Sequence, residues 1–368
     1  MSSPGESDFT AETWANPHVR SLHPYVPGKQ PKGSDWTKLN TNELPYPPSP
    51  KVSEAVAAEV SRLPKYPSPT SAPLREAIAA HHGLDPSQVL IGNGSDEILT
   101  MLFRAFAGPE REAGETTPSY SLYPVLATIQ NTSVQSYALE KDLNLPLEEI
   151  ASCRAPVFFL TTPNAPFGKG FSLDELRTAI DGFAGIFVAD EAYADFGDTS
   201  AIELLSQCKN LVVTRSFSKS YGLAGLRVGY ALASPEIIGL LDRLRDSYNV
   251  NCLSQAGALA AFQDQAYLNL VVGKVKATRE HFSVALRSMG WEVVPSQANF
   301  IFARPPVSGE QNRSALASEI FSRLESKKIL VRYFPKDPLT ADGLRISIGT
   351  DDEMDRCLES LAAPPIGG

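Results

Sequence analysis

Short, wholly apolar runs alternate with amphipathic stretches in the middle of this chain. The runs at 157–160, 186–189 and 211–213 contain no polar residue, which is typical of strands buried on both faces. Helical spacing of apolar residues occurs between them, at about 172–181 and 199–207. Strands that alternate with helices predict a largely parallel sheet covered by helices on both sides, that is, an α/β fold.

The first eighty residues show a different pattern. Residues 1 to about 20 are predicted to be a loose tail, and the proline-rich segments 23–29 and 39–50 are predicted to form an extended arm, because proline presets the backbone and disfavours a helix. The valines in 52–62 recur at helical spacing, and 73–82 is a predicted helix with proline in its first turn.

The character of the sequence changes again after residue 251. A long helical region extends to 289 and precedes shorter strand and helix patterns, which indicate a smaller α+β domain. These patterns are predicted strands at 291–294, 299–302, 329–332 and 344–348, and a helix near 314–327. We therefore divide the chain into a tail and arm (1–45), a large domain (46–251) and a small C-terminal domain (252–368).

Composition excludes several classes of protein. The 368 residues carry a net charge of −9, without the basic cluster expected of a nucleic-acid-binding protein. No apolar run approaches the length needed to cross a bilayer. The four cysteines are scattered without CxxC spacing, which argues against a zinc site and a disulfide framework and favours a reducing cytoplasm. We expect no metal, no nucleic acid and no membrane among the partners.

The segment 214–230 carries the most informative chemistry. Lys219 follows a predicted strand, beside Ser216 and Ser218, and Arg227 lies eight residues further on. A lysine near a second cation has a lowered pKa and can attack a carbonyl, and serines with an arginine can hold a phosphate. Pyridoxal phosphate requires both functions. These residues alone are also compatible with an ordinary solvated loop.

The stretch 216–230, Ser-Phe-Ser-Lys-Ser-Tyr-Gly-Leu-Ala-Gly-Leu-Arg-Val-Gly-Tyr, resembles the lysine signature of fold-type I aminotransferases that use pyridoxal 5'-phosphate. The likeness is greatest to the histidinol-phosphate aminotransferase family and covers the chain from about Leu22 to about Leu361. It implies a mostly parallel sheet in a large domain, a smaller α+β domain, and Lys219 as the catalytic residue that holds the coenzyme as a Schiff base.

The resemblance also implies a set of coenzyme-binding residues. Asp190 matches the partner of the ring nitrogen, Tyr193 and Asn164 match the partners of the ring 3-oxygen, and Tyr120 matches the aromatic residue stacked on the ring. The matching residues for the coenzyme phosphate are Gly94, Ser95, Asp96 (through its backbone N–H, with the side chain turned away), Ser216, Ser218, Arg227, and Tyr66 of the neighbouring subunit. Taken alone, the Asp-x-x-Tyr pair also fits a helix cap or a surface pair. The glycine turn at 92–97 also fits an ordinary helix start capped by Ser95.

Two arginines and a tyrosine match the family's substrate-binding residues. Arg345 corresponds to the arginine that grips the substrate α-carboxylate as a bidentate pair, and Arg332 supplies a second cation for a phosphate. Tyr25, in the arm, matches a tyrosine that covers the substrate. The segment 161–168 departs from the family pattern at Thr162 and Phe167, which leaves the shape of the substrate pocket open.

The resemblance therefore predicts a homodimer with shared active sites that transfers an amino group between histidinol phosphate and 2-oxoglutarate, with glutamate as the amino donor. Aminotransfer on aromatic amino acids is an alternative that the departures at Thr162 and Phe167 keep open. Decarboxylation of a phosphorylated amino acid on the same scaffold is another. A ligand sensor without turnover is disfavoured by the intact Lys219 and the lack of a basic appendage. A plain nucleotide-binding α/β protein would not explain Lys219, Asp190 and Arg345 together.

Overall fold

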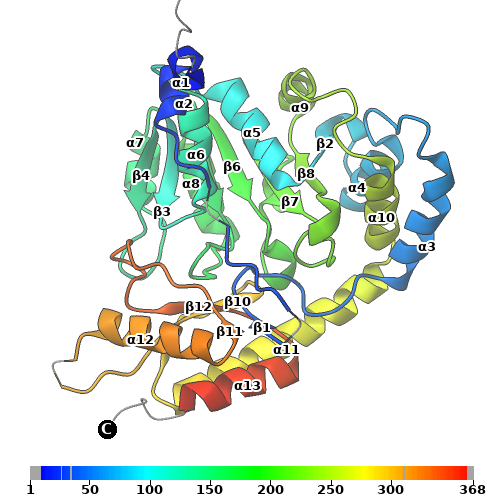
Figure 1. The fold of residues 1–368 in the computed structure, drawn as a ribbon. Coiled ribbons are helices and arrows are strands. Elements are labelled where there is room, and N and C mark those ends of the chain that lie inside the picture. The colour runs from blue at the N-terminus through cyan, green and yellow to red at the C-terminus, as the bar shows by residue number, and fades with distance from the viewer. Residues whose placement is uncertain (1–9, 26, 34, 310, 363–368) are drawn as a thin grey trace, which may run out of the picture.

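A seven-stranded sheet forms the centre of the larger part of the molecule (Figure 1). The computed structural model describes residues 10–25, 27–33, 35–309 and 311–362. The strand order is β2-β8-β7-β6-β5-β3-β4, and β8 runs antiparallel to both neighbours while the other neighbouring pairs are parallel. The strands are β2 (Val89–Gly92), β3 (Ala113–Thr117), β4 (Val134–Ala138), β5 (Val157–Thr161), β6 (Ile186–Asp190), β7 (Leu211–Ser216) and β8 (Gly229–Leu232). The expected α/β fold with a mostly parallel sheet is confirmed.

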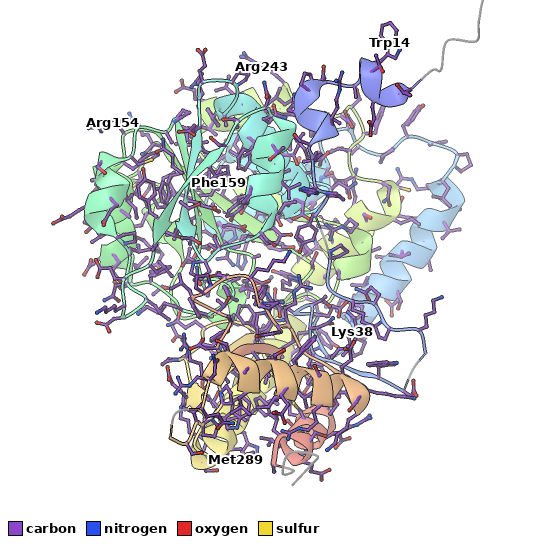
Figure 2. The ribbon with its side chains drawn as sticks, turned by 60° about the vertical axis from the view of Figure 1, so that its left-hand side comes forward. Trp14, Lys38, Arg154, Phe159, Arg243 and Met289 are labelled. Carbon is purple, nitrogen blue, oxygen red and sulfur yellow. The ribbon has the colours of Figure 1, made fainter. Side chains whose placement is uncertain are left out.

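A small antiparallel sheet, in the order β12-β10-β9, forms the second part of the molecule. Its strands are β9 (Glu292–Val293), β10 (Phe300–Arg304) and β12 (Leu344–Ser347), and it is accompanied by α11 (Gln265–Ser288), α12 (Arg313–Ser326) and α13 (Asp351–Ala362). Figure 2 places Phe159 in the large sheet and Met289 at the opposite end of the molecule, beyond the small sheet. Apolar side chains of these three helices pack against the small sheet in a separate hydrophobic cluster.

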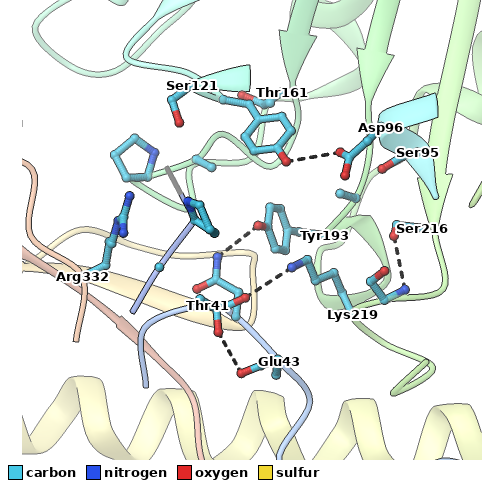
Figure 3. Close-up of a pocket in the computed structure, with 18 of the residues that line it drawn as sticks. Thr41, Glu43, Ser95, Asp96, Ser121, Thr161, Tyr193, Ser216, Lys219 and Arg332 are labelled. Atoms are coloured by element: carbon cyan, nitrogen blue, oxygen red, sulfur yellow. Dashed lines mark hydrogen bonds between the residues drawn. The ribbon is translucent and has the colours of Figure 1, made fainter. Parts of the chain in front are cut away.

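The N-terminal segment connects the two sheets. Two single-turn helices, α1 (Ala11–Trp14) and α2 (Pro17–Arg20), precede an extended arm that contains β1 (Thr37–Lys38). β1 pairs in parallel with β11 (Ile329–Leu330), which lies between β10 and β12 of the small sheet along the chain. The arm then enters the pocket between the two sheets, where Thr41 and Glu43 lie close to Lys219 (Figure 3).

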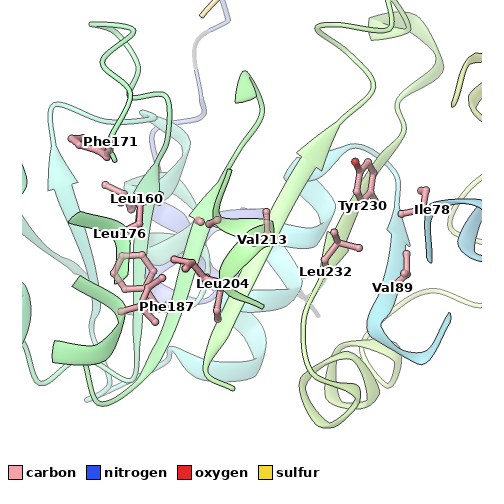
Figure 4. Close-up of a cluster of buried hydrophobic side chains, with 14 of the residues drawn as sticks. Ile78, Val89, Leu160, Phe171, Leu176, Phe187, Leu204, Val213, Tyr230 and Leu232 are labelled. Atoms are coloured by element: carbon pink, nitrogen blue, oxygen red, sulfur yellow. The ribbon is translucent and has the colours of Figure 1, made fainter. Parts of the chain in front are cut away.

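On most strands of the large sheet, alternating side chains enter two different cores, as a period of two requires. On β5, Phe158 and Leu160 belong to one hydrophobic cluster, and Val157 and Phe159 belong to the other. The helices α4 (Ala72–His82), α8 (Leu173–Gly182) and α10 (Cys252–Phe262) contribute to the first core, part of which is drawn in Figure 4. The helices α5 (Ser95–Phe106), α6 (Leu122–Ile129) and α9 (Pro235–Asp242) contribute to the second. The remaining helices are α3 (Pro50–Glu59) and α7 (Leu147–Ser152).

Most elements expected from the sequence are present, with four differences. The prediction of a helix at 199–207 is wrong, because that segment forms only a 3-10 turn at Ala201–Leu204. The long helical region is interrupted between α10 and α11. Ser95 does not cap α5: it is the first helical residue, and Gly94 occupies the N-cap position without a side-chain bond. Short helices occur at 11–20 instead of a loose tail, whereas residues 1–9 lie outside the described part.

The division into domains remains a prediction. Because α10 packs against α3 and shares the core of the large sheet, we propose that the boundary lies after α10 rather than before it. Within the described residues, no helix combines the length and the apolar character needed to cross a membrane.

Candidate active site

One pocket gathers most of the residues singled out from the sequence. It lies at the carboxyl ends of β5, β6 and β7, beside the N-terminus of α5, which is where parallel α/β sheets bind ligands. Of the site residues predicted from the sequence, those that line this pocket are Tyr25, Ser95, Asp96, Tyr120, Asp190, Tyr193, Ser216, Ser218, Lys219, Arg227, Arg332 and Arg345. Gly94, Asn164 and Tyr66 do not line it.

Lys219 lies in the loop that follows β7, facing the arm. Its Nζ donates a hydrogen bond of 3.4 Å to the backbone oxygen of Thr41 and lies 5.6 Å from the centre of the Tyr193 ring. Figure 3 shows Lys219 between Thr41 and Tyr193, reaching into the pocket. The partner is a carbonyl, and among the described residues the amine forms no salt bridge that would have to break before it reacts.

Asp190, at the end of β6, is the buried carboxylate of the site. Its exposure is 3 %, and its two oxygens accept hydrogen bonds from the Tyr123 hydroxyl (2.8 Å) and the Thr214 hydroxyl (3.0 Å). Burial raises the pKa of Asp190 from 3.8 to about 6, although both hydrogen bonds act in the opposite direction. A cation placed beside this carboxylate would favour its ionised form. Its environment therefore suits a protonated heterocyclic nitrogen.

Two residues expected at a ring oxygen differ in their surroundings. The Tyr193 hydroxyl lies in the pocket and accepts a 3.0 Å hydrogen bond from Asn42 Nδ2. Asn164 is fully buried behind the pocket, and its Nδ2 donates to the Pro118 oxygen at 3.0 Å. Its Oδ1 has no hydrogen-bond partner in the described part of the chain. A contact of Asn164 with a ligand stays a prediction.

The start of α5 and the loop before β8 form an anion cradle. Gly94 has φ +81°, a backbone conformation that residues with a Cβ rarely adopt, so this turn favours glycine. Arg227 donates to Ser218 Oγ (3.3 Å) and to the Asp96 carboxylate (3.0 Å). The backbone N–H groups at the start of α5, with no side-chain cap, remain available for an anion.

The Asp96 side chain differs from its expected placement. We expected this side chain to point away from the site. Its carboxylate instead lines the pocket and accepts hydrogen bonds from Arg227 and from the Tyr120 hydroxyl (3.2 Å). This pairing holds the Tyr120 ring at the pocket wall, where Tyr25 meets its edge at a centroid distance of 6.1 Å. The ring is thus held at a position from which it could cover a planar ligand.

Arg332 and Arg345 face each other across an antiparallel bridge. Each backbone N–H donates to the other residue's oxygen at 2.9 Å. Both guanidinium groups lie near the ring of Phe334, at 5.4 and 5.5 Å. Neither arginine forms a salt bridge with a carboxylate among the described residues. Burial lowers the pKa of Arg345, and the charge of Arg332 contributes in the same direction. Two close cations without an acidic partner create a site for an anion.

The two positions at which this sequence departs from the family pattern, Thr162 and Phe167, lie away from the pocket. Phe167 is 1 % exposed and meets Phe302 of the small sheet edge to face, with centroids 5.0 Å apart. Thr162 is buried, and its N–H donates to the Asp190 backbone oxygen. Phe167 therefore packs the large part of the molecule against the small one and does not line the pocket.

Sequence reasoning missed several residues of the site. Thr41, Asn42 and Glu43 of the arm, and Phe334 beside the arginines, line the pocket. Tyr123 reaches Asp190 from α6. Asn42 has φ 56°, a left-handed backbone that asparagine tolerates better than other non-glycine residues, but that conformation is visible only in the structure.

A lysine, a buried carboxylate and an anion cradle at the carboxyl edge of a mostly parallel sheet, with paired arginines facing them across one pocket, define the class. The chain belongs to the aminotransferase class I and II family, whose model matches residues 34–361. It is 45% identical over 349 residues to a histidinol-phosphate aminotransferase of Geobacter sulfurreducens, covering 94% of this chain and 97% of the relative. The same name, identity and coverage apply to a relative from Syntrophotalea carbinolica over 350 residues. The crystal structure of histidinol-phosphate aminotransferase from Sinorhizobium meliloti in complex with pyridoxal-5'-phosphate has a TM-score of 0.85 to this structure, with 26% identity and 97% of each chain covered.

Proposed function

We propose that this protein is a histidinol-phosphate aminotransferase that uses pyridoxal 5'-phosphate, in the pathway of histidine biosynthesis. It would transfer the amino group of glutamate to the keto precursor of histidinol phosphate and release 2-oxoglutarate. Membership of the aminotransferase family and the name shared by relatives at 45% identity support this proposal.

The observation that supports this choice of substrates is the pair formed by Arg332 and Arg345. Glutamate brings an α-carboxylate, whereas histidinol phosphate lacks that group and brings a phosphate. A site that serves both substrates in turn must bind two different anions in one pocket. Two cations with backbones paired at 2.9 Å and a shared aromatic neighbour meet that requirement.

The pocket residues suit pyridoxal phosphate. The cradle of Ser95, Ser218 and Arg227 would hold its phosphate, and the Gly94 position, which a Cβ would fill, permits this close approach. Asp190 would stand at the ring nitrogen and Tyr193 at the ring 3-oxygen. When bound, the coenzyme supplies an aldehyde for the substrate amine and a ring that withdraws electrons from the reacting carbon.

The chain's own residues then supply binding and proton transfer. Lys219 would hold the coenzyme covalently and, once displaced by the substrate amine, move a proton as general base and acid. Asp190 would keep the ring nitrogen protonated. Arg345 would fix the substrate carboxylate, Arg332 the phosphate, and Tyr25 would cover the substrate and exclude water.

We further propose that the active form is a homodimer with shared sites. Tyr66 is 80 % exposed and stacks on Tyr248 with centroids 4.4 Å apart, in a region where Val60 and Leu63 are also exposed. Such an exposed aromatic and aliphatic group suits contact with a second copy, from which Tyr66 would reach the partner's coenzyme phosphate. The cytoplasm remains the predicted location, and the four cysteines, which are free thiols in this structure, are compatible with its reducing conditions.

The test is to mix purified protein, loaded with pyridoxal phosphate, separately with histidinol phosphate, glutamate and phenylalanine. We expect the visible absorbance of the coenzyme to bleach with the first two and to respond weakly to phenylalanine. The keto product of histidinol phosphate should form in the same reaction, and a further mixture with a phosphorylated amino acid should release no carbon dioxide. Bleaching by phenylalanine alone would establish the aromatic alternative, and release of carbon dioxide from a phosphorylated amino acid would establish the decarboxylase.

A further inference from the structure

A buried asparagine of the arm connects the small sheet to the Tyr193 hydroxyl. Asn42 is 1 % exposed, and its Nδ2 donates to the Tyr193 oxygen at 3.0 Å. Its Oδ1 accepts a 2.8 Å hydrogen bond from the hydroxyl of Ser347, at the end of β12. Its backbone oxygen accepts from Asn299 Nδ2 at 2.9 Å. The side chain is therefore bonded at both ends and anchored through its backbone.

The directions of these bonds follow from a count of hydrogens. Ser347 Oγ accepts the backbone N–H of Asn42 at 2.9 Å, so its one proton is free to go to Asn42 Oδ1. Because Oδ1 then serves as acceptor, the NH₂ group of the amide must be the end that faces Tyr193. An N–H occupies the phenol oxygen as donor, which leaves the single proton of Tyr193 to be donated elsewhere.

We infer that Ser347 and Asn42 act as positioning residues that fix the hydrogen-bond polarity of Tyr193, so that its proton is presented to an acceptor in the pocket. This inference rests on the proposed function, in which that acceptor is the 3-oxygen of the coenzyme ring. An ionised 3-oxygen accepts a charge-assisted hydrogen bond, which is about twice as strong as a neutral one. A reversed Tyr193 would instead present lone pairs to that oxygen and repel it.

The position of Ser347 adds a structural condition. Ser347 belongs to the small sheet, and its backbone N–H donates to the Leu39 oxygen of the arm at 3.0 Å. The polarity of Tyr193, a residue that follows β6 in the large sheet, is thus set by a strand of the small sheet through the arm between them. Tyr193 presents its proton to the pocket only when the arm is seated between the two sheets.

The experiment compares two ligands that bind without a covalent bond: pyridoxamine phosphate and its 3-deoxy analogue. Each is titrated calorimetrically into coenzyme-free wild-type protein, Asn42→Asp and Ser347→Ala. Asn42→Asp keeps the shape but replaces the donor facing Tyr193 by an acceptor, which draws the phenol proton away from the pocket. We expect pyridoxamine phosphate to bind about ten- to a hundredfold more weakly and the 3-deoxy analogue to change less than about threefold.

Two further variants separate polarity from charge and from damage to the fold. Ser347→Ala introduces no charge and frees the amide to turn, so we expect a selective loss of about two- to tenfold for pyridoxamine phosphate. Asn299→Asp puts a carboxylate on the other side of Asn42 without touching Tyr193, and should affect both ligands alike. Ser347→Ala carries the test if Asn42→Asp does not fold, as judged by circular dichroism.

The outcomes are distinguishable. Equal weakening of both ligands by Asn42→Asp and Ser347→Ala would overturn the inference and leave Asn42 a structural residue, while the proposed function would stand. If the wild-type protein does not bind pyridoxamine phosphate, the proposed function fails, and the inference with it. A selective loss with Asn299→Asp as large as that with Asn42→Asp would assign the effect to charge and also overturn the inference.

Discussion

Replacing Asp190 by asparagine should stabilise the coenzyme-free protein while it damages the reaction. The carboxyl is buried, and its pKa rises from 3.8 to about 6 on folding. The contribution of such a group to the unfolding free energy is fully present below about pH 3.8. It is lost as the pH rises through about 6. A rise of about 2 pH units at about 1.4 kcal/mol each gives a cost of about 3 kcal/mol above pH 6, which asparagine does not incur. The hydroxyls of Tyr123 and Thr214 can rotate to serve either end of the amide.

The assay is urea unfolding of the coenzyme-free protein between pH 4 and pH 8 at a fixed protein concentration. Other titrating groups contribute to both proteins, so the difference in unfolding free energy isolates Asp190. We expect the advantage of Asp190→Asn to grow by about 2–3 kcal/mol between pH 4 and pH 8. A difference that stays constant over this range would refute the argument that burial dominates the ionisation of Asp190.

The loaded enzyme should respond in the opposite direction. Without a carboxylate beside it, the ring nitrogen loses its proton more readily, and the electron-withdrawing capacity on which turnover depends declines. We expect turnover of Asp190→Asn to fall by at least about a hundredfold, or about 2.7 kcal/mol of barrier. A loss of only a few-fold would mean that Asp190 is not the partner of the ring nitrogen.

Three further predictions concern Lys219, the two paired arginines and Tyr66. Lys219→Ala should abolish turnover while the coenzyme still binds without a covalent bond; steady turnover without added amines would contradict the catalytic assignment. Arg332→Ala should slow the single-turnover half-reaction with histidinol phosphate about ten- to a hundredfold and affect that with glutamate less, whereas Arg345→Ala should damage the glutamate half-reaction. Equal damage from Arg332→Ala would make Arg332 structural, and Arg332→Lys should restore only part of the loss because it lacks the planar fork. Mixed dimers of Tyr66→Ala and Lys219→Ala, each inactive alone, should regain partial activity because one site then carries neither change; hetero-dimers no more active than the parents would exclude a role of Tyr66 across the interface.

The sequence was informative wherever a functional residue follows a buried strand. Asp190 and Lys219 each come shortly after an apolar run, and parallel strands bring their carboxyl ends to one edge of the sheet. The pattern of strands therefore also predicted that these side chains would gather at one site, and both line the same pocket. Expectations for single side chains were less secure: Ser95 does not cap α5, and the carboxylate of Asp96 is in the pocket wall.

What the sequence determined by itself is the mostly parallel sheet and the chemistry at its edge, because apolar periodicity and short motifs are local properties of the chain. Only the tertiary structure decided that the backbones of Arg332 and Arg345 pair and that Phe167 packs outside the pocket. The same holds for the bonds by which Asn42 joins Ser347 to Tyr193. Asn42 and Ser347 are separated by 305 residues, and no periodicity records such a contact. It arises when the arm packs between the two sheets, because a buried polar group without a partner is costly and Asn42 and Ser347 bond to each other there.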